Sequence, residues 1–170
     1  MQNKKTLFIM VGAPGSGKST FAAAHASRGD SAIISRDKIR FSMVGEDEEY
    51  FSKENAVFKE FTNQISNALN SPWIQEVWAD ATHMTTTART KLLVNIKIPL
   101  EDIHICPIVV RPDLDTCLRQ NDMREGRAVV PHTAIKKMLQ SYQDPAKDGI
   151  KYKQIYYTGG NINAENLRNE

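Results

Sequence analysis

The chain has 170 residues, of which 25% are charged and 41% hydrophobic, and its net charge is +2. This composition is typical of one globular domain with an ordinary core, and it excludes a mainly disordered chain. Because the charges nearly balance, no global basic field draws the protein to nucleic acids or membranes, so an anionic ligand has to be held by a local cluster. The two cysteines, Cys106 and Cys117, form no CxxC pair, and the longest early apolar run, residues 7–11, is too short for a signal segment or a membrane span. We therefore expect a cytoplasmic protein in a reducing compartment, with no membrane partner.

Short apolar runs alternate with segments of helical periodicity along the chain. The apolar runs predict strands over residues 6–11, 32–35, 73–79, 103–110 and 154–157. The spacing of apolar residues predicts a first helix that ends near residue 26 and further helices over 36–44, 53–69, 85–96, 113–123 and 131–142. This alternation predicts an α/β fold in a single domain, with a mostly parallel sheet of about five strands and helices on both faces. Ligands of such sheets bind beyond the carboxyl ends of the strands, so the residues that follow each strand are the candidates for a functional site.

The segment after the first predicted strand fits the phosphate-binding pattern GxxxxGK[ST] in full, since it reads GAPGSGKS. Glycines let the backbone approach phosphates, successive N–H groups form an anion-sized nest, and the following helix adds the positive end of its dipole. Lys18 would place its ammonium on the β and γ phosphates, and Ser19 would offer its hydroxyl to Mg²⁺. The pattern predicts a P-loop NTPase fold with ATP and Mg²⁺ as ligands; a glycine-rich turn without a ligand is the alternative. The predicted nucleotide-binding residues are Gly12, Ala13, Pro14, Gly15, Ser16, Gly17, Lys18, Ser19 and Thr20.

Two charged residues follow the strand over 32–35. If this strand lies next to the first one, Asp37 faces the γ-phosphate across the groove, where a carboxylate accepts the proton of an attacking hydroxyl. Arg40 lies three residues later on the same helix face and would hold a phosphate of the acceptor bidentately. The alternative is that Asp37 only caps the helix and Arg40 is a surface cation.

A second carboxylate, Asp80, ends the apolar run over 77–79. An aspartate at a strand end beside a P-loop usually holds a Mg²⁺-bound water, which would make Asp80 a metal-site residue together with Ser19. The alternative is that Asp80 caps the helix over 85–96.

Residues 118–131, which we call the lid segment, join two predicted helices and carry three arginines around Gly126. A closing arginine stabilises the charge that spreads over a transferred phosphoryl group, and Gly126 would let the segment move. The alternative is a solvated helix end. Residues from about 158 to 170 predict a polar tail with no functional signal.

Four segments in this order, GAPGSGKST, SRDKIR, WADATHMTTTAR and RPDLDTCLRQNDMREGRAVVP, resemble the P-loop kinase family of the bacteriophage polynucleotide 5′-kinase type. The resemblance covers about residues 5–145 and implies transfer of the γ-phosphate of ATP to the 5′-hydroxyl of DNA or RNA. It implies that Lys18 and Ser19 bind the phosphates and Mg²⁺ and that Asp37 is the general base. Arg40 is implied as the clamp on the acceptor phosphate, and Asp80 matches the acid after the third strand.

The resemblance leaves two readings of the lid. Counted forward from Asn121, Arg124 matches the family's lid arginine, which touches the ATP phosphates. Counted backward from Pro131, Glu125 falls at that place, so Arg127 is the alternative. The leading hypothesis is a kinase of polynucleotide 5′ ends. The alternatives are a small-molecule or nucleotide kinase on the same scaffold and an ATP-binding module without catalysis.

Overall fold

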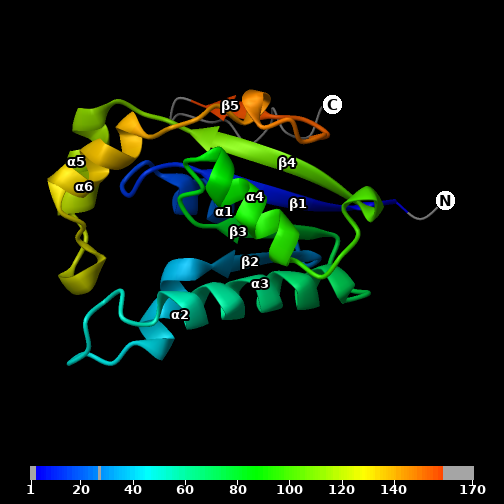
Figure 1. Ribbon diagram of the computed structural model, residues 1–170, viewed down its shortest axis with the longest axis horizontal. Helices are drawn as coiled ribbons and strands as arrows, with labels where there is room; N and C mark the ends of the chain where they lie inside the picture. The colour runs from blue at the N-terminus through cyan, green and yellow to red at the C-terminus, as the bar shows by residue number, and fades with distance from the viewer. Residues whose placement is uncertain (1–2, 27, 159–170) are drawn as a thin grey trace.

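The computed structural model describes residues 3–26 and 28–158 (Figure 1). Within this part, five strands alternate with six α-helices, as the sequence predicts. The strands are β1 (Lys5–Val11), β2 (Ser31–Ser35), β3 (Glu76–Asp80), β4 (Ile103–Val110) and β5 (Tyr156–Thr158). The helices are α1 (Lys18–His25), α2 (Arg36–Met43), α3 (Glu54–Asn70), α4 (Thr86–Asn95), α5 (Leu114–Asp122) and α6 (His132–Gln140), with short 3-10 turns η1 (Leu100–Asp102), η2 (Gly126–Ala128) and η3 (Pro145–Lys147). Apart from Thr158, the predicted polar tail lies outside the described residues.

The strands form one sheet in the order β2-β3-β1-β4-β5, and every pair is parallel. The sheet confirms the predicted fold class. The condition on which Asp37 was placed opposite the γ-phosphate, that β2 lies next to β1, is not met, because β3 lies between them. Asp80, at the end of β3, therefore lies between the strand that leads to the P-loop and the strand that leads to Asp37. The predicted third strand also begins late, at Glu76, and Trp73 lies before it with 81% of its surface exposed.

Alternate residues of β1 face two separate apolar clusters. Leu7 and Ile9 are fully buried in a large cluster that includes residues of α3, α4, α5 and α6. Phe8 and Met10 face a smaller cluster with α1, where the rings of Phe8 and Trp78 stack with centroids 4.2 Å apart. Helices thus cover both faces of the sheet, which is why β1 reads as a continuous apolar run.

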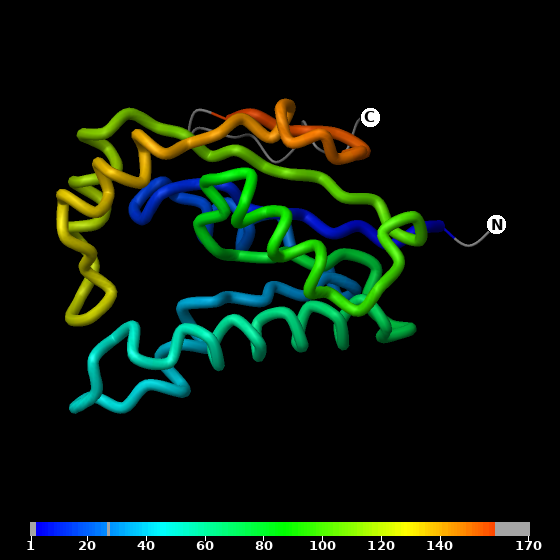
Figure 2. Tube along the Cα trace, viewed as in Figure 1, coloured from blue at the N-terminus to red at the C-terminus, as the bar shows by residue number. Residues whose placement is uncertain are grey.

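All strands end on the same side of the molecule (Figures 1 and 2). On this side lie α5, α6 and the loop from α2 to α3, opposite the start of β1. A parallel sheet brings the residues that follow its strands to one edge, so the predicted site residues gather there. No helix in the described part of the chain has the length and apolarity needed to cross a bilayer.

Candidate active site

The loop between β1 and α1, residues 12–19, depends on glycines for its shape. Gly15 and Gly17 have φ angles of 78° and 88°, in the left-handed region that residues with a side chain rarely adopt. A Cβ atom on Gly15 would lie 2.2 Å from the carbonyl oxygen of Cys117, so this turn packs directly against the backbone of α5. Gly17 is the N-cap of α1 and provides no side-chain cap, which leaves the first N–H groups of the helix for an anionic ligand.

A cavity of about 870 Å³ opens beside this loop, a size that is typical of small-molecule sites. Residues 15–21 with Ala24 and His25 form one wall, and residues 110–113 with parts of α5 and the lid segment form the other. The first three predicted residues, Gly12, Ala13 and Pro14, do not line the cavity and are buried beneath the loop. They therefore support the loop from beneath.

Two residues of the cavity wall, Phe21 and His25, were not predicted from the sequence. Phe21 and His25 lie four residues apart on α1, and their rings stack with centroids 3.9 Å apart. Such spacing on a helix brings two rings to the same face, which is the signal that would have found them.

Three charged residues that the sequence singles out, Asp80, Asp37 and Arg124, act electrostatically on Lys18. Its side chain is buried, with 5% of the residue exposed, and it has no hydrogen-bond or ion-pair partner among the described residues. Burial lowers the pKa of Lys18, the carboxylates of Asp80 and Asp37 act in the opposite direction, and Arg124 lowers the pKa further. A buried ammonium without a direct partner needs an anion, and the phosphates of a nucleotide would supply it.

Ser19 and Asp80 form the second half of the phosphate site. The Ser19 hydroxyl donates a hydrogen bond of 2.7 Å to Asp80 Oδ2, while Asp80 Oδ1 is buried with no hydrogen-bond partner. Thr85, not Asp80, caps α4, because its Oγ1 accepts from the Ala88 N–H at 3.1 Å. Hydroxyl and carboxylate oxygens fit Mg²⁺, which usually takes one or two protein ligands and completes its shell with water and phosphates. Among the described residues, no group of three or more His, Cys, Asp and Glu side chains could hold a metal ion.

At the start of α2, a buried arginine holds the side chain of Asp37 at the surface. Ser35 is the N-cap of α2 and accepts from the Lys38 N–H, so Asp37 is not the cap. The Asp37 side chain is 54% exposed, and its Oδ1 accepts a hydrogen bond from Arg40 Nη1. Arg40 is 6% exposed and is therefore not a surface cation. The arrangement leaves a carboxylate free to meet a ligand.

Glu54, which the sequence analysis missed, holds Arg40 in place. Its two oxygens accept from Arg40 Nε at 2.5 Å and from Nη2 at 3.1 Å, and one of them also accepts from Arg36 Nη2 at 3.0 Å. Burial opposes the charge of Arg40, but the hydrogen bond to Glu54 raises its pKa overall. Glu54 is the first residue of α3, where an acid is expected for the helix dipole alone, so its sequence position hides this role.

The lid arginines separate into two places. Arg124 lines the cavity beside the P-loop. Arg127 does not line it, because its guanidinium donates to the carbonyl oxygens of Gly45 at 2.9 Å and Val44 at 3.4 Å and lies over the ring of Phe41 at 5.5 Å. Of the two alternatives, Arg124 is thus on the nucleotide side, whereas Arg127 joins the lid segment to the loop after α2.

Another arginine, Arg89, lies in a buried hydrogen-bond network. It is fully buried and pairs with Asp148 through Nε at 2.6 Å and Nη2 at 2.8 Å. Its other hydrogen bonds go to the carbonyl oxygens of His83 at 2.8 Å and Gln143 at 2.7 Å. The remaining donors to Asp148 are Thr86 Oγ1 and Tyr152 Oη. This network ties the segment after the lid to the loop after β3.

Solved structures with the same fold include several kinases. The Pnkp1/Rnl/Hen1 RNA repair complex matches with a TM-score of 0.68 and 23% identity, covering 83% of this chain and 45% of that chain. A fungal RNA kinase matches with a TM-score of 0.66 and 14% identity over 92% of this chain and 38% of that one. The chain thus spans less than half the length of either. A gluconokinase from Sinorhizobium meliloti 1021 matches with a TM-score of 0.60 and 13% identity over 98% and 89%.

Comparison with curated protein sequences finds no significant match. The family model described as an AAA domain matches residues 7–145. This match spans the P-loop, the Ser19–Asp80 pair, the Asp37–Arg40 pair and the lid segment. The chain therefore belongs to this AAA-domain family, and it shares its fold with solved P-loop kinases.

Proposed function

We propose that the protein transfers the γ-phosphate of ATP to the 5′-hydroxyl of a polynucleotide. The observation that carries the proposal is the exposed carboxylate of Asp37, held by a buried arginine and electrostatically coupled to Lys18. In the presence of a nucleotide at the P-loop, such a carboxylate would accept the proton of a hydroxyl that attacks the γ-phosphate. The RNA-repair and RNA-kinase structures with this fold support a nucleic-acid end as acceptor.

In this proposal, different residues of the chain assist different parts of a single phosphoryl-transfer step. Lys18 and Arg124 bind the phosphate oxygens and stabilise the charge on the transferred group. Asp37 accepts the proton of the 5′-hydroxyl as its oxygen forms a bond to the γ-phosphorus, and the bond from that phosphorus to the β–γ bridging oxygen breaks to release ADP. Ser19 and Asp80 would hold Mg²⁺, which neutralises phosphate charge when bound.

A small hydroxyl compound is the second candidate acceptor. The match to the gluconokinase covers nearly the whole of both chains, whereas the nucleic-acid kinases are much longer. The fold serves both classes, so the choice between them rests on the acceptor side of the site.

The deciding experiment incubates the protein and Mg²⁺ with γ-labelled ATP and a panel of 5′-hydroxyl oligonucleotides, nucleosides, sugars and gluconate. We expect label on the oligonucleotides, and a loss of roughly 10²- to 10⁴-fold in rate for Asp37→Asn. Label on sugars or gluconate alone would replace the proposal with the second candidate. Unchanged transfer by Asp37→Asn would remove Asp37 as the base.

We also propose a reducing, cytoplasmic location. Cys106 and Cys117 are both buried free thiols, and burial raises the pKa of each. Thiol titration of the denatured protein, isolated without reductant, should find both thiols; a disulfide would contradict the assignment.

A further inference from the structure

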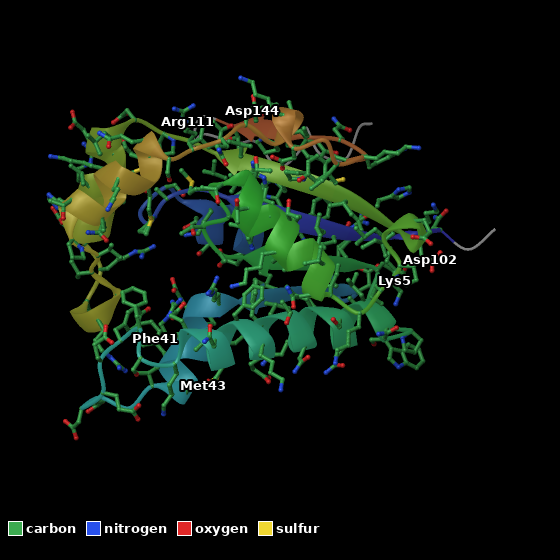
Figure 3. All side chains as sticks on the ribbon, in the orientation of Figure 1. Lys5, Phe41, Met43, Asp102, Arg111 and Asp144 are labelled. Atoms are coloured by element: carbon green, nitrogen blue, oxygen red, sulfur yellow. The ribbon has the colours of Figure 1, made fainter. Side chains whose placement is uncertain are left out.

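Three aromatic rings gather beside Asp37, on α2 and on the loop that follows it. The ring centroids of Phe41 and Tyr50 are 5.5 Å apart, and those of Tyr50 and Phe51 are 4.8 Å apart. Phe41 and Phe51 are 41% and 53% exposed, which is unusual for adjacent large apolar side chains. We call Phe41, Tyr50 and Phe51 the aromatic platform. Figure 3 labels Phe41 at the end of α2 that faces the lid segment.

Two arginines support the platform. The Arg40 guanidinium lies 5.0 Å from the ring centre of Tyr50 and 5.2 Å from that of Phe51. Arg127 lies 5.5 Å from Phe41 and 5.8 Å from Tyr50. Both cations are themselves held, Arg40 by Glu54 and Arg127 by carbonyl oxygens at the end of α2. The rings are therefore held in place, and a part of each phenylalanine remains open to a ligand.

The aromatic platform adjoins Asp37, the residue proposed to accept the hydroxyl proton. The Tyr50 hydroxyl lies 3.5 Å from Asp37 Oδ1 and 3.5 Å from Arg40 Nη1. An acceptor whose hydroxyl is at Asp37 has to extend over neighbouring surface, and the rings are part of that surface. Aromatic side chains beside the reacting group are suited to a planar π system next to the acceptor hydroxyl.

The charges around the platform argue against a long phosphate backbone lying on it. The same loop carries four consecutive acidic residues, Glu46–Glu49, of which Glu48 pairs with Lys53 at 3.0 Å. The rest of this acidic run would repel phosphates, while stacking on the rings needs no charge. The chemistry therefore favours one base at the acceptor end over a bound strand.

We infer that the aromatic platform stacks the terminal nucleobase of the acceptor and so selects base-bearing 5′ ends over sugars and polyols. This inference rests on the proposed function and deepens it. Stacking of one base on aromatic side chains changes affinity by about 5- to 150-fold, so a base should improve kcat/KM by roughly tenfold or more.

The test compares two short oligonucleotides that share a 5′-hydroxyl and differ only in whether the terminal residue carries a base or is abasic. We expect the wild type to prefer the base-bearing acceptor by about tenfold or more in kcat/KM. Phe41→Ala and Phe51→Ala should remove most of this preference, because they should lower kcat/KM far more for the base-bearing acceptor than for the abasic one. Phe51→Trp should keep the preference, because it retains a stacking surface. Trp73→Ala, which removes an exposed aromatic residue far from the site, is the matched control and should change neither rate.

A second readout does not depend on turnover. An oligonucleotide with 2-aminopurine at its 5′ end should lose fluorescence on binding to the wild type and lose less on binding to Phe51→Ala, because stacking quenches this base. An unchanged KM for ATP in each variant shows that the fold is retained.

The outcomes separate the inference from the proposed function. Equal kcat/KM for base-bearing and abasic ends, or equal losses on both in the phenylalanine variants, overturns the platform while 5′-end transfer stands. If no oligonucleotide gains label and a sugar does, the proposed function fails and the platform assignment fails with it.

Discussion

Two buried arginines, Arg89 and Arg40, have partners that differ in their exposure to solvent. Arg89 is fully buried, and its partner Asp148 is also fully buried with donors to both oxygens. Arg40 is nearly as buried, but one of its partners, Asp37, is 54% exposed. The first region is closed, since the groups that face Arg89 are satisfied within the protein. The second is open, since its buried cation holds a carboxylate at the surface.

The Arg89–Asp148 and Arg40–Asp37 pairs show how a structural ion pair differs from one that contributes to a functional site. A buried pair with a complete hydrogen-bond shell holds chain segments together, and breaking it leaves an uncompensated charge. A pair that leaves carboxylate surface exposed retains capacity for a ligand. Substitutions in the closed region around Arg89 should therefore lower stability. Substitutions in the open region around Arg40 should mainly change the kinetics with the acceptor.

The largest effect is expected in the closed region. Arg89→Met leaves Asp148 buried without its cation, so the free energy of unfolding should fall by about 3–5 kcal/mol. Urea denaturation followed by circular dichroism measures this. The double variant Arg89→Met with Asp148→Leu should recover part of the loss. A single-variant loss under about 1 kcal/mol would mean that the network does not carry the stability assigned to it.

His83, whose carbonyl accepts from Arg89, should make the closed region sensitive to acid. Burial lowers its pKa from 6.5 to about 4, despite the hydrogen bond of 2.8 Å that Nδ1 donates to the Met10 carbonyl; the facing charges are the cations of Lys18, Arg36 and Arg89.

Between pH 6.5 and 4 the unfolded chain binds a proton that the folded protein excludes, so stability is full above this window and falls by about 3 kcal/mol as pH is lowered through it. Unfolding measured across the window checks this. His83→Asn should flatten this slope, and asparagine tolerates the positive φ of 42° at this position. A wild-type slope that the substitution leaves intact would assign the acid sensitivity to other groups.

In the open region, Arg40→Ala should act mainly on the acceptor. We expect a loss of about 2 kcal/mol, or roughly 30-fold, in kcat/KM for acceptors with a phosphate near the hydroxyl, with a smaller effect on stability than Arg89→Met. Steady-state kinetics on acceptors with and without that phosphate measures it. Arg40→Lys keeps the charge but loses the planar fork that Glu54 holds, and should be nearly as impaired. Equal losses on both acceptors would leave no role for Arg40 as a phosphate clamp.

The smallest effect is expected at Arg127, which joins the lid segment to the loop after α2. Arg127→Ala removes the hydrogen bonds to Val44 and Gly45, so KM for the acceptor should rise about fivefold while KM for ATP stays unchanged. Arg124→Ala is the matched variant, and it should impair ATP instead because Arg124 lines the nucleotide cavity. The reverse pattern would exchange the roles of the two lid arginines.

The sequence predicted the parts of the site that depend on local motifs. The P-loop and the aspartate after the third strand follow from short patterns, and the structure brings Ser19 and Asp80 within 2.7 Å of each other. The alternation of strands and helices was sufficient for the fold class.

Features that depend on contacts between distant parts of the chain could not be predicted from the sequence. Local periodicity carries no strand order, so the position of β3 between β1 and β2 was missed. The pairing of Glu54 with Arg40 joins two helices across a loop and has no spacing rule. Arg89 did leave a signal, since it shares the apolar face of α4 with Leu92, Leu93 and Ile96, and an arginine in such a stripe indicates a buried partner elsewhere.

The contact between Gly15 and the carbonyl oxygen of Cys117 joins the P-loop to α5 through main chain alone. The lid segment begins within α5, directly after Cys117, so this contact also fixes where the lid segment starts relative to the P-loop. A methyl group on residue 15 would stand 2.2 Å from that carbonyl oxygen and force α5 away from the loop. The close approach of α5 to the P-loop therefore requires glycine at position 15.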